Sequence, residues 1–98
     1  MKLIPFPQEE HTGIQGRLAR TGKLSTTRVG AEYGQYLLGD VVLTPWQQSL
    51  RVVLVQSYSS LEDHPYRQEL TPRALAAIGA QTFEVVWLEV VSGCSAVW

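Results

Sequence analysis

Apolar and polar positions follow two spacings along this chain, and glycines and prolines separate the segments. Ile14 and Leu18 lie four residues apart, which indicates one face of a helix. Two uninterrupted runs of four apolar residues begin at Val52 and Val85, which is typical of buried strands. The pattern predicts helices over residues 9–21 and 72–78. It predicts extended segments over residues 2–6, 24–29, 40–44, 50–58 and 82–91.

Local signals set the ends of these elements. Gly22 is placed to end the first helix, although Gly13 and Gly16 each weaken a helix by roughly 1 kcal/mol. Thr71 can cap the second helix, with a proline directly after it at the first helical position. Prolines 5 and 7 keep the first extended segment out of a central strand position.

This order of elements predicts the fold class. One helix precedes the strands and another interrupts them, and the strands are short apolar runs joined by glycine-rich turns. We therefore expect an α+β fold, built as a small, mainly antiparallel barrel or half-barrel with helices at its ends. A chain of 98 residues with 45% hydrophobic content supports one domain, residues 1–98, with one core.

The charges are nearly balanced in number but not in position. Eight basic and nine acidic residues give a net charge of −1. Residues 11–31 nevertheless hold four cations and no acid, namely Arg17, Arg20, Lys23 and Arg28. Such a stretch either attracts an anionic partner or forms a solvated helix face.

Several classes of protein are not expected from the composition. No apolar run approaches the roughly 18 residues that span a membrane, and the start of the chain lacks signal-peptide features. The single cysteine, Cys94, permits neither an internal disulfide nor a cysteine-based zinc site, and we expect it to be inert. His11 and His64 are isolated, so we expect no metal and no cofactor. We expect a cytoplasmic protein that is a monomer or a weak dimer.

One short segment has the residue types of a reactive site. Gly22-Lys23-Leu24-Ser25-Thr26-Thr27-Arg28 enters the second extended segment directly from the first helix. Alternate residues of a strand share a face, so Leu24, Thr26 and Arg28 should point together. Lys23 lies at the corner, where its long side chain can reach either face. A hydroxyl beside an amine and a guanidinium is the arrangement of an activated nucleophile.

This segment, followed by Tyr36-Leu37-Leu38-Gly39-Asp40 before a buried strand, resembles the ASCH domain, which has a PUA-like barrel. Among its members, the chain looks most similar to the small bacterial N(4)-acetylcytidine amidohydrolases. The resemblance implies hydrolysis of the acyl amide on acylated cytidine. It also implies a catalytic lysine and threonine, which match Lys23 and Thr26, and a glutamate in the connection before the second helix. Glu69 is the candidate for that glutamate, and Glu62 is the fallback.

The reaction gives these residues roles. Thr26 would be the nucleophile, Lys23 the base or oxyanion donor, and Glu69 the proton shuttle. Arg28 either contacts the substrate or forms an ion pair, with Glu32 or Asp40 as partner. Aromatic side chains in the neighbouring loops can stack on a pyrimidine. These stacking candidates are Tyr33, Tyr36 and Trp46.

Two other functions are compatible with the same features. The first is an RNA-binding module without catalysis, which the basic stretch and the loop tyrosines favour. The second is a nuclease that cuts single-stranded RNA. The sequence leaves open the acyl group and whether the substrate is a nucleoside, a nucleotide or RNA.

Overall fold

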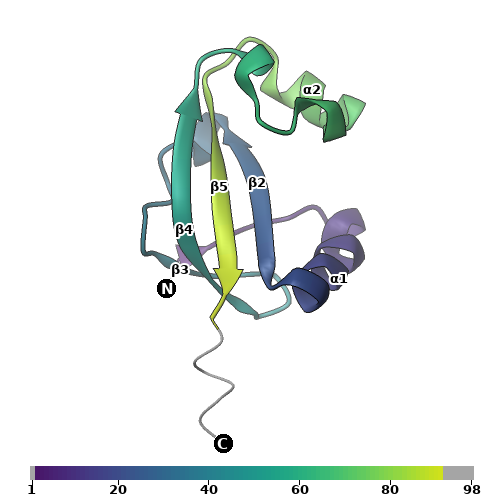
Figure 1. The fold of residues 1–98 in the computed structure, drawn as a ribbon, viewed down its shortest axis with the longest axis vertical. Helices are drawn as coiled ribbons and strands as arrows, with labels where there is room; N and C mark the ends of the chain where they lie inside the picture. The colour runs from purple at the N-terminus through teal and green to yellow at the C-terminus, as the bar shows by residue number, and fades with distance from the viewer. Residues whose placement is uncertain (1, 92–98) are drawn as a thin grey trace, which may run out of the picture.

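A five-stranded sheet forms the centre of the computed structural model, which describes residues 2–91 (Figure 1). The strand order is β1-β3-β4-β5-β2. Neighbouring strands are antiparallel except for β1 and β3, which are parallel. Cys94 lies outside the described residues. The strands are β1 (Lys2–Leu3), β2 (Lys23–Val29), β3 (Val41–Leu43), β4 (Ser49–Tyr58) and β5 (Phe83–Val90).

Two α-helices and four short 3-10 turns complete the described chain. The helices are α1 (His11–Thr21) and α2 (Pro72–Ile78), and the turns are η1 (Gln8–Glu10), η2 (Gly30–Glu32), η3 (Leu61–Asp63) and η4 (Arg67–Glu69). The predicted α+β class with two short helices is confirmed, and only the first extended segment is shorter than predicted by more than two residues at one end. Within residues 2–91, no helix is long and apolar enough to cross a membrane.

The expected barrel is wrong in one respect, because the sheet is open. Strands β1 and β2 lie at its two edges and do not pair with each other. The physical reason lies in the first segment: β1 is only two residues long, and Pro5 and Pro7 follow it. Proline has no amide hydrogen for a ladder, so this segment cannot extend far enough to close the sheet.

The two faces of the sheet are covered by different helices. Neighbouring residues of a strand point to opposite faces, so Val85 and Val86 of β5 belong to separate hydrophobic clusters. Val86 packs with Leu18 of α1, whereas Val85 packs with Ile78 of α2. Figure 1 shows the two helices beside β2, toward opposite ends of that strand.

A tight corner joins α1 to β2. Gly22 adopts a left-handed conformation, with φ of +70°, and its N–H donates to the Leu18 carbonyl at 2.8 Å. A side chain would strain this cap, so the glycine allows the strand to begin at the next residue. The Thr21 hydroxyl accepts a hydrogen bond from the backbone N–H of Lys23 at 3.1 Å. The segment with the reactive residue types therefore starts at a fixed point beside the helix.

The outer edge of β2 is partly free. The N–H of Val90 donates to the Gly22 carbonyl, so alternate residues from Gly22 onward direct their backbone groups toward β5. The residues between them, Ser25 and Thr27, direct theirs outward. Within residues 2–91, no backbone hydrogen bond to this outward side of Ser25 or Thr27 is found. The edge is thus accessible along the middle of the strand.

Candidate functional site

Thr26 lies in a groove between β2 and α1. The groove has a volume of about 320 Å³, which is at the small end of the range for ligand sites. The residues that line it come from the segment before α1, from the helix itself and from β2. They are Phe6, Glu9, Glu10, Gly13, Ile14, Arg17, Leu24, Ser25 and Thr26. The predicted nucleophile is therefore at a hollow surface that also holds carboxylates and a guanidinium.

Lys23 lies on the same strand but points elsewhere. It pairs with Glu89 across the sheet, and its amine is 3.9 Å from the Glu89 carboxylate. Residues 23 and 26 are an odd number of positions apart on the strand, so their side chains point to opposite faces of the sheet. The Lys23 side chain is 73% exposed. It does not line the Thr26 groove, although solvent leaves it free to change rotamer.

Glu69 and Glu62 lie in a second hollow. This cavity has a volume of about 590 Å³ and is formed by the loop that contains η3 and η4. His64 and Tyr66 line it as well. The three predicted catalytic side chains, Lys23, Thr26 and Glu69, are therefore not brought together. Of these three side chains, only that of Thr26 belongs to the groove beside α1.

Arg28 is buried, with 6% of its surface exposed. Its Nη1 donates to Glu32 and to the Pro5 carbonyl, both at 2.8 Å. Its guanidinium carbon lies 4.8 Å from the centre of the Phe6 ring and 5.7 Å from that of Tyr36. Of the two roles predicted for Arg28, the structure shows the ion pair, and its partner is Glu32. Burial among these groups argues against a substrate contact.

Tyr36 belongs to the same cluster and is 3% exposed. Its hydroxyl donates to Glu32 at 2.8 Å. Burial, followed by this hydrogen bond, raises the pKa of the Tyr36 hydroxyl above its usual range. The Tyr36 ring is a core side chain, so its burial argues against stacking on a ligand.

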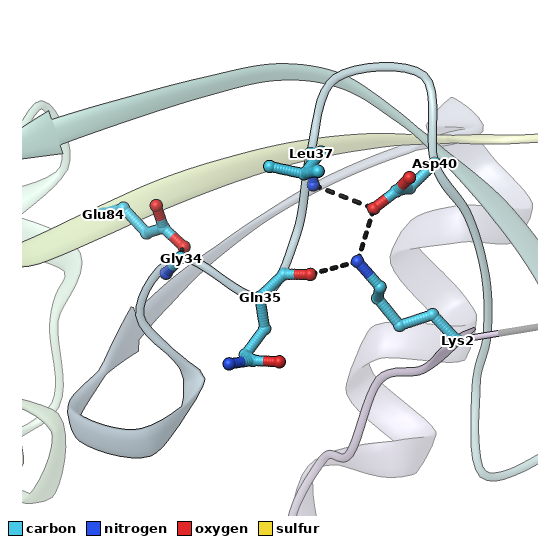
Figure 2. Close-up of polar contacts among 6 residues, drawn as sticks. All are labelled: Lys2, Gly34, Gln35, Leu37, Asp40 and Glu84. Carbon is cyan, nitrogen blue, oxygen red and sulfur yellow. Dashed lines mark hydrogen bonds and ion pairs between the residues drawn. The ribbon is translucent and has the colours of Figure 1, made fainter.

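The loop before Tyr36 is also held by a buried carboxylate. The Gly34 N–H donates to buried Glu84 at 2.8 Å (Figure 2).

The other two aromatic candidates also have partners within the fold. Trp46 packs against Phe6 and His11, with ring centres 5.7 and 5.1 Å apart, respectively. Tyr33 is 38% exposed, and its hydroxyl donates to Ser57 at 3.0 Å. Neither Tyr33 nor Trp46 lines the Thr26 groove. The groove instead has Phe6 as its aromatic residue.

The second motif, which ends at Asp40, forms a loop bound to the N-terminal strand. Figure 2 shows Lys2 reaching Asp40, at 2.7 Å, and the Gln35 carbonyl. Asp40 also accepts the N–H of Leu37 at 2.9 Å. These bonds, that of Lys2 first, lower the pKa of the Asp40 carboxyl. Asp40 therefore holds the loop in place, and it does not line the Thr26 groove.

His64, which is isolated in the sequence, is buried in the fold. It is 6% exposed and stacks on Phe83 with ring centres 5.2 Å apart. The Tyr66 N–H donates to Nδ1 at 2.9 Å, so in the neutral ring Nε2 carries the hydrogen and donates to the Thr27 hydroxyl at 2.7 Å. This bond attaches the cavity-forming loop to β2. In the sequence His64 is marked only by the proline that follows it, which predicts a loop and not a buried contact.

The site shows no arrangement for a metal. Within residues 2–91, no group of three or more histidine, cysteine or acidic side chains could hold an ion.

Comparisons of the chain with protein-family models, with curated proteins and with solved structures found no match.

We predict that replacing Arg28 destabilises the fold. Arg28→Met leaves Glu32 and the Pro5 carbonyl without their buried donor, so the free energy of unfolding should fall by about 3 kcal/mol. Urea unfolding measures this change, with Arg20→Met as the matched control, because Arg20 is exposed on α1. Equal stability of the two variants would contradict a structural role for Arg28.

We predict that acid weakens the fold through His64. Burial lowers the pKa of His64 below that of a free imidazole, so the unfolded chain binds the proton first. Stability from this residue is complete above a pH of about 6.5, the pKa of unfolded histidine, and declines as the pH falls below it. Urea unfolding between pH 7.5 and pH 5, both rough limits set by that pKa, should show this decline. His64→Gln should be less stable at neutral pH and show a shallower decline, and an unchanged slope would refute the assignment.

Proposed function

We propose that this protein is a small amidohydrolase that removes the acyl group from the N(4) amine of acylated cytidine derivatives. The observation that carries the proposal is the position of Thr26 in a groove lined by ionisable side chains. The Gly-Lys-x-x-Thr-x-Arg segment supports the same reaction through its resemblance to the ASCH domain. The open sheet differs from the PUA-like barrel of that family, so the proposal rests on the motif and the groove.

Amide hydrolysis in such a groove has three chemical requirements. A hydroxyl must attack the amide carbonyl, a base must take its proton, and an acid must protonate the leaving amine. The Thr26 hydroxyl meets the first requirement. The developing oxyanion also needs a cationic or N–H donor nearby.

Lys23 serves this reaction only after a change of rotamer. Residues three apart on a strand are separated by about 10 Å, so its amine must leave Glu89 and turn around the free edge of β2 to approach Thr26. Its exposure makes this movement inexpensive in free energy, because an exposed ion pair is worth at most about 1 kcal/mol. Glu69 and Glu62 belong to the other cavity, and the geometry supports neither as the proton shuttle for Thr26.

The proposal predicts that the hydroxyl of Thr26 is essential for activity. The assay is release of cytidine from N(4)-acetylcytidine, followed by the change in absorbance of the base. Thr26→Val keeps the shape of the side chain but removes the nucleophile, so hydrolysis should fall to the rate without enzyme. Thr26→Ser keeps a hydroxyl and should retain measurable activity. Absence of hydrolysis by the natural protein, or full activity of Thr26→Val, would contradict the proposal.

A second candidate function is binding of RNA without catalysis. It is favoured by the separation of the predicted catalytic side chains and by three exposed cations near the corner of α1 and β2. These are Arg17, Arg20 and Lys23. Contacts of this kind are made to phosphates and depend strongly on salt.

The second function predicts that RNA affinity falls steeply as salt increases. Each lost phosphate contact should reduce the slope of log affinity against log salt by about 1, so Arg17→Gln and Arg20→Gln should each do so. Titration of a fluorescent single-stranded RNA at several salt concentrations measures this slope, and a gel of the same mixture detects strand cleavage. Hydrolysis of an uncharged nucleoside should be nearly independent of salt, which separates the two functions.

A further inference from the structure

One face of α1 forms the second wall of the Thr26 groove. Glu10, at the start of the helix, is followed at intervals of three, four and seven residues by Gly13, Ile14 and Arg17. Residues with this spacing lie on the same side of a helix. All four line the groove, opposite Thr26.

The order of these residues along the groove wall follows from helix geometry. In Figure 1, the chain leaves α1 and enters β2, which runs back from the corner between them. Along the chain, Glu10 lies about one turn before Gly13, and Arg17 lies about one turn after it. Gly13 and Thr26 line the same groove, from its two walls.

Gly13 leaves open space beside the helix in this groove. A Cβ built on Gly13 would meet no atom within 4 Å, so a ligand can approach the helix backbone there. Glycine inside a helix costs roughly 1 kcal/mol relative to alanine. Gly13 therefore has a carboxylate about one turn before it and a guanidinium about one turn after it, in the groove that also contains the candidate nucleophile.

Of the two carboxylates in the groove, Glu9 already has a partner. It forms an ion pair with Arg73 of α2, and hydrogen bonds from its own backbone amide and from Arg73 lower the pKa of its carboxyl. Glu10 forms no ion pair within residues 2–91. Arg17 is likewise unpaired in the part of the chain that the structure describes.

We propose that Glu10, and not Glu69, is the carboxylate that transfers protons in the reaction at Thr26, with Arg17 facing the oxyanion. This inference rests on the proposed amide hydrolysis. It assigns both roles to side chains that share a groove with the nucleophile. No carboxylate from the separate cavity formed by η3 and η4 then takes part in the reaction.

The reaction then has two balanced halves. The Thr26 oxygen bonds to the acyl carbon while its proton passes to the Glu10 carboxylate. The C–N bond then breaks, and the leaving cytidine amine takes that proton, which leaves an acyl ester on Thr26. Water next attacks the ester and gives a proton to Glu10. As the ester C–O bond breaks, this proton returns to the Thr26 oxygen, and the free carboxylic acid departs.

The test compares Glu10→Gln and Glu69→Gln in the N(4)-acetylcytidine assay. Glu10→Gln should lower kcat/KM by about 10²- to 10⁴-fold, the usual contribution of a general base, and by at least about tenfold more than Glu69→Gln does. Asp63→Asn is a matched control, because Asp63 is an exposed carboxylate on η3 outside both hollows. Urea unfolding of each variant shows whether a loss of activity reflects unfolding.

Gly13→Met gives an independent measurement. Methionine favours a helix more than glycine does, so this variant should be at least as stable as the natural protein, yet its side chain should occupy the groove and abolish hydrolysis. If the natural protein hydrolyses the substrate but Glu10→Gln is as active as Asp63→Asn, the inference is wrong and the proposed function stands. Activity of Gly13→Met equal to that of the natural protein would likewise place the reaction outside this groove. If the natural protein shows no hydrolysis, both fail.

Discussion

The buried guanidinium of Arg28 holds together segments that secondary structure alone would leave separate. Its hydrogen bonds reach the backbone after β1 and the carboxylate of Glu32 in η2. The rings of Phe6 and Tyr36 lie within cation–π distance on the same group. A charge this deeply buried is costly unless it is paired, so these segments must stay in place around it. Because Phe6 also lines the Thr26 groove, the position of the groove depends on the same interaction.

Much of the fold could be predicted from local signals. The caps at Gly22 and Thr71 set the helix ends, and the Thr71 hydroxyl does accept the N–H of Ala74. Strand alternation correctly placed Leu24, Thr26 and Arg28 on one face. Their partners on β5 are alternate residues, and two of these, Leu88 and Val86, pack in the same cluster as Leu18 of α1. These features depend on residues close together in the chain, where spacing and conformational preference decide the outcome.

The position of Glu69 and the closure of the sheet could not be predicted, because both depend on contacts between segments far apart in the chain. The loop with Glu69 is attached to β2 by the bond from His64 to Thr27, which joins residues 37 positions apart. No periodicity in the sequence records that pairing, so Glu69 could be matched to the motif but not to a place beside Thr26. The closure of the sheet likewise depended on how far β1 extends. The sequence alone did not predict that α1 lines the groove, because a glycine such as Gly13 within a helix indicates only a lower helix stability.

The Thr21 hydroxyl has a consequence for how this protein behaves at high concentration. A long exposed strand edge is a template on which other chains can add and form aggregates. The Thr21 oxygen accepts the N–H of Lys23 and lies 3.0 Å from its carbonyl, so the first position of the β2 edge is already occupied. The charged Lys23 side chain at the same point further discourages an incoming strand. One hydroxyl at the end of a helix thus shortens the stretch of edge on which assembly between molecules could begin.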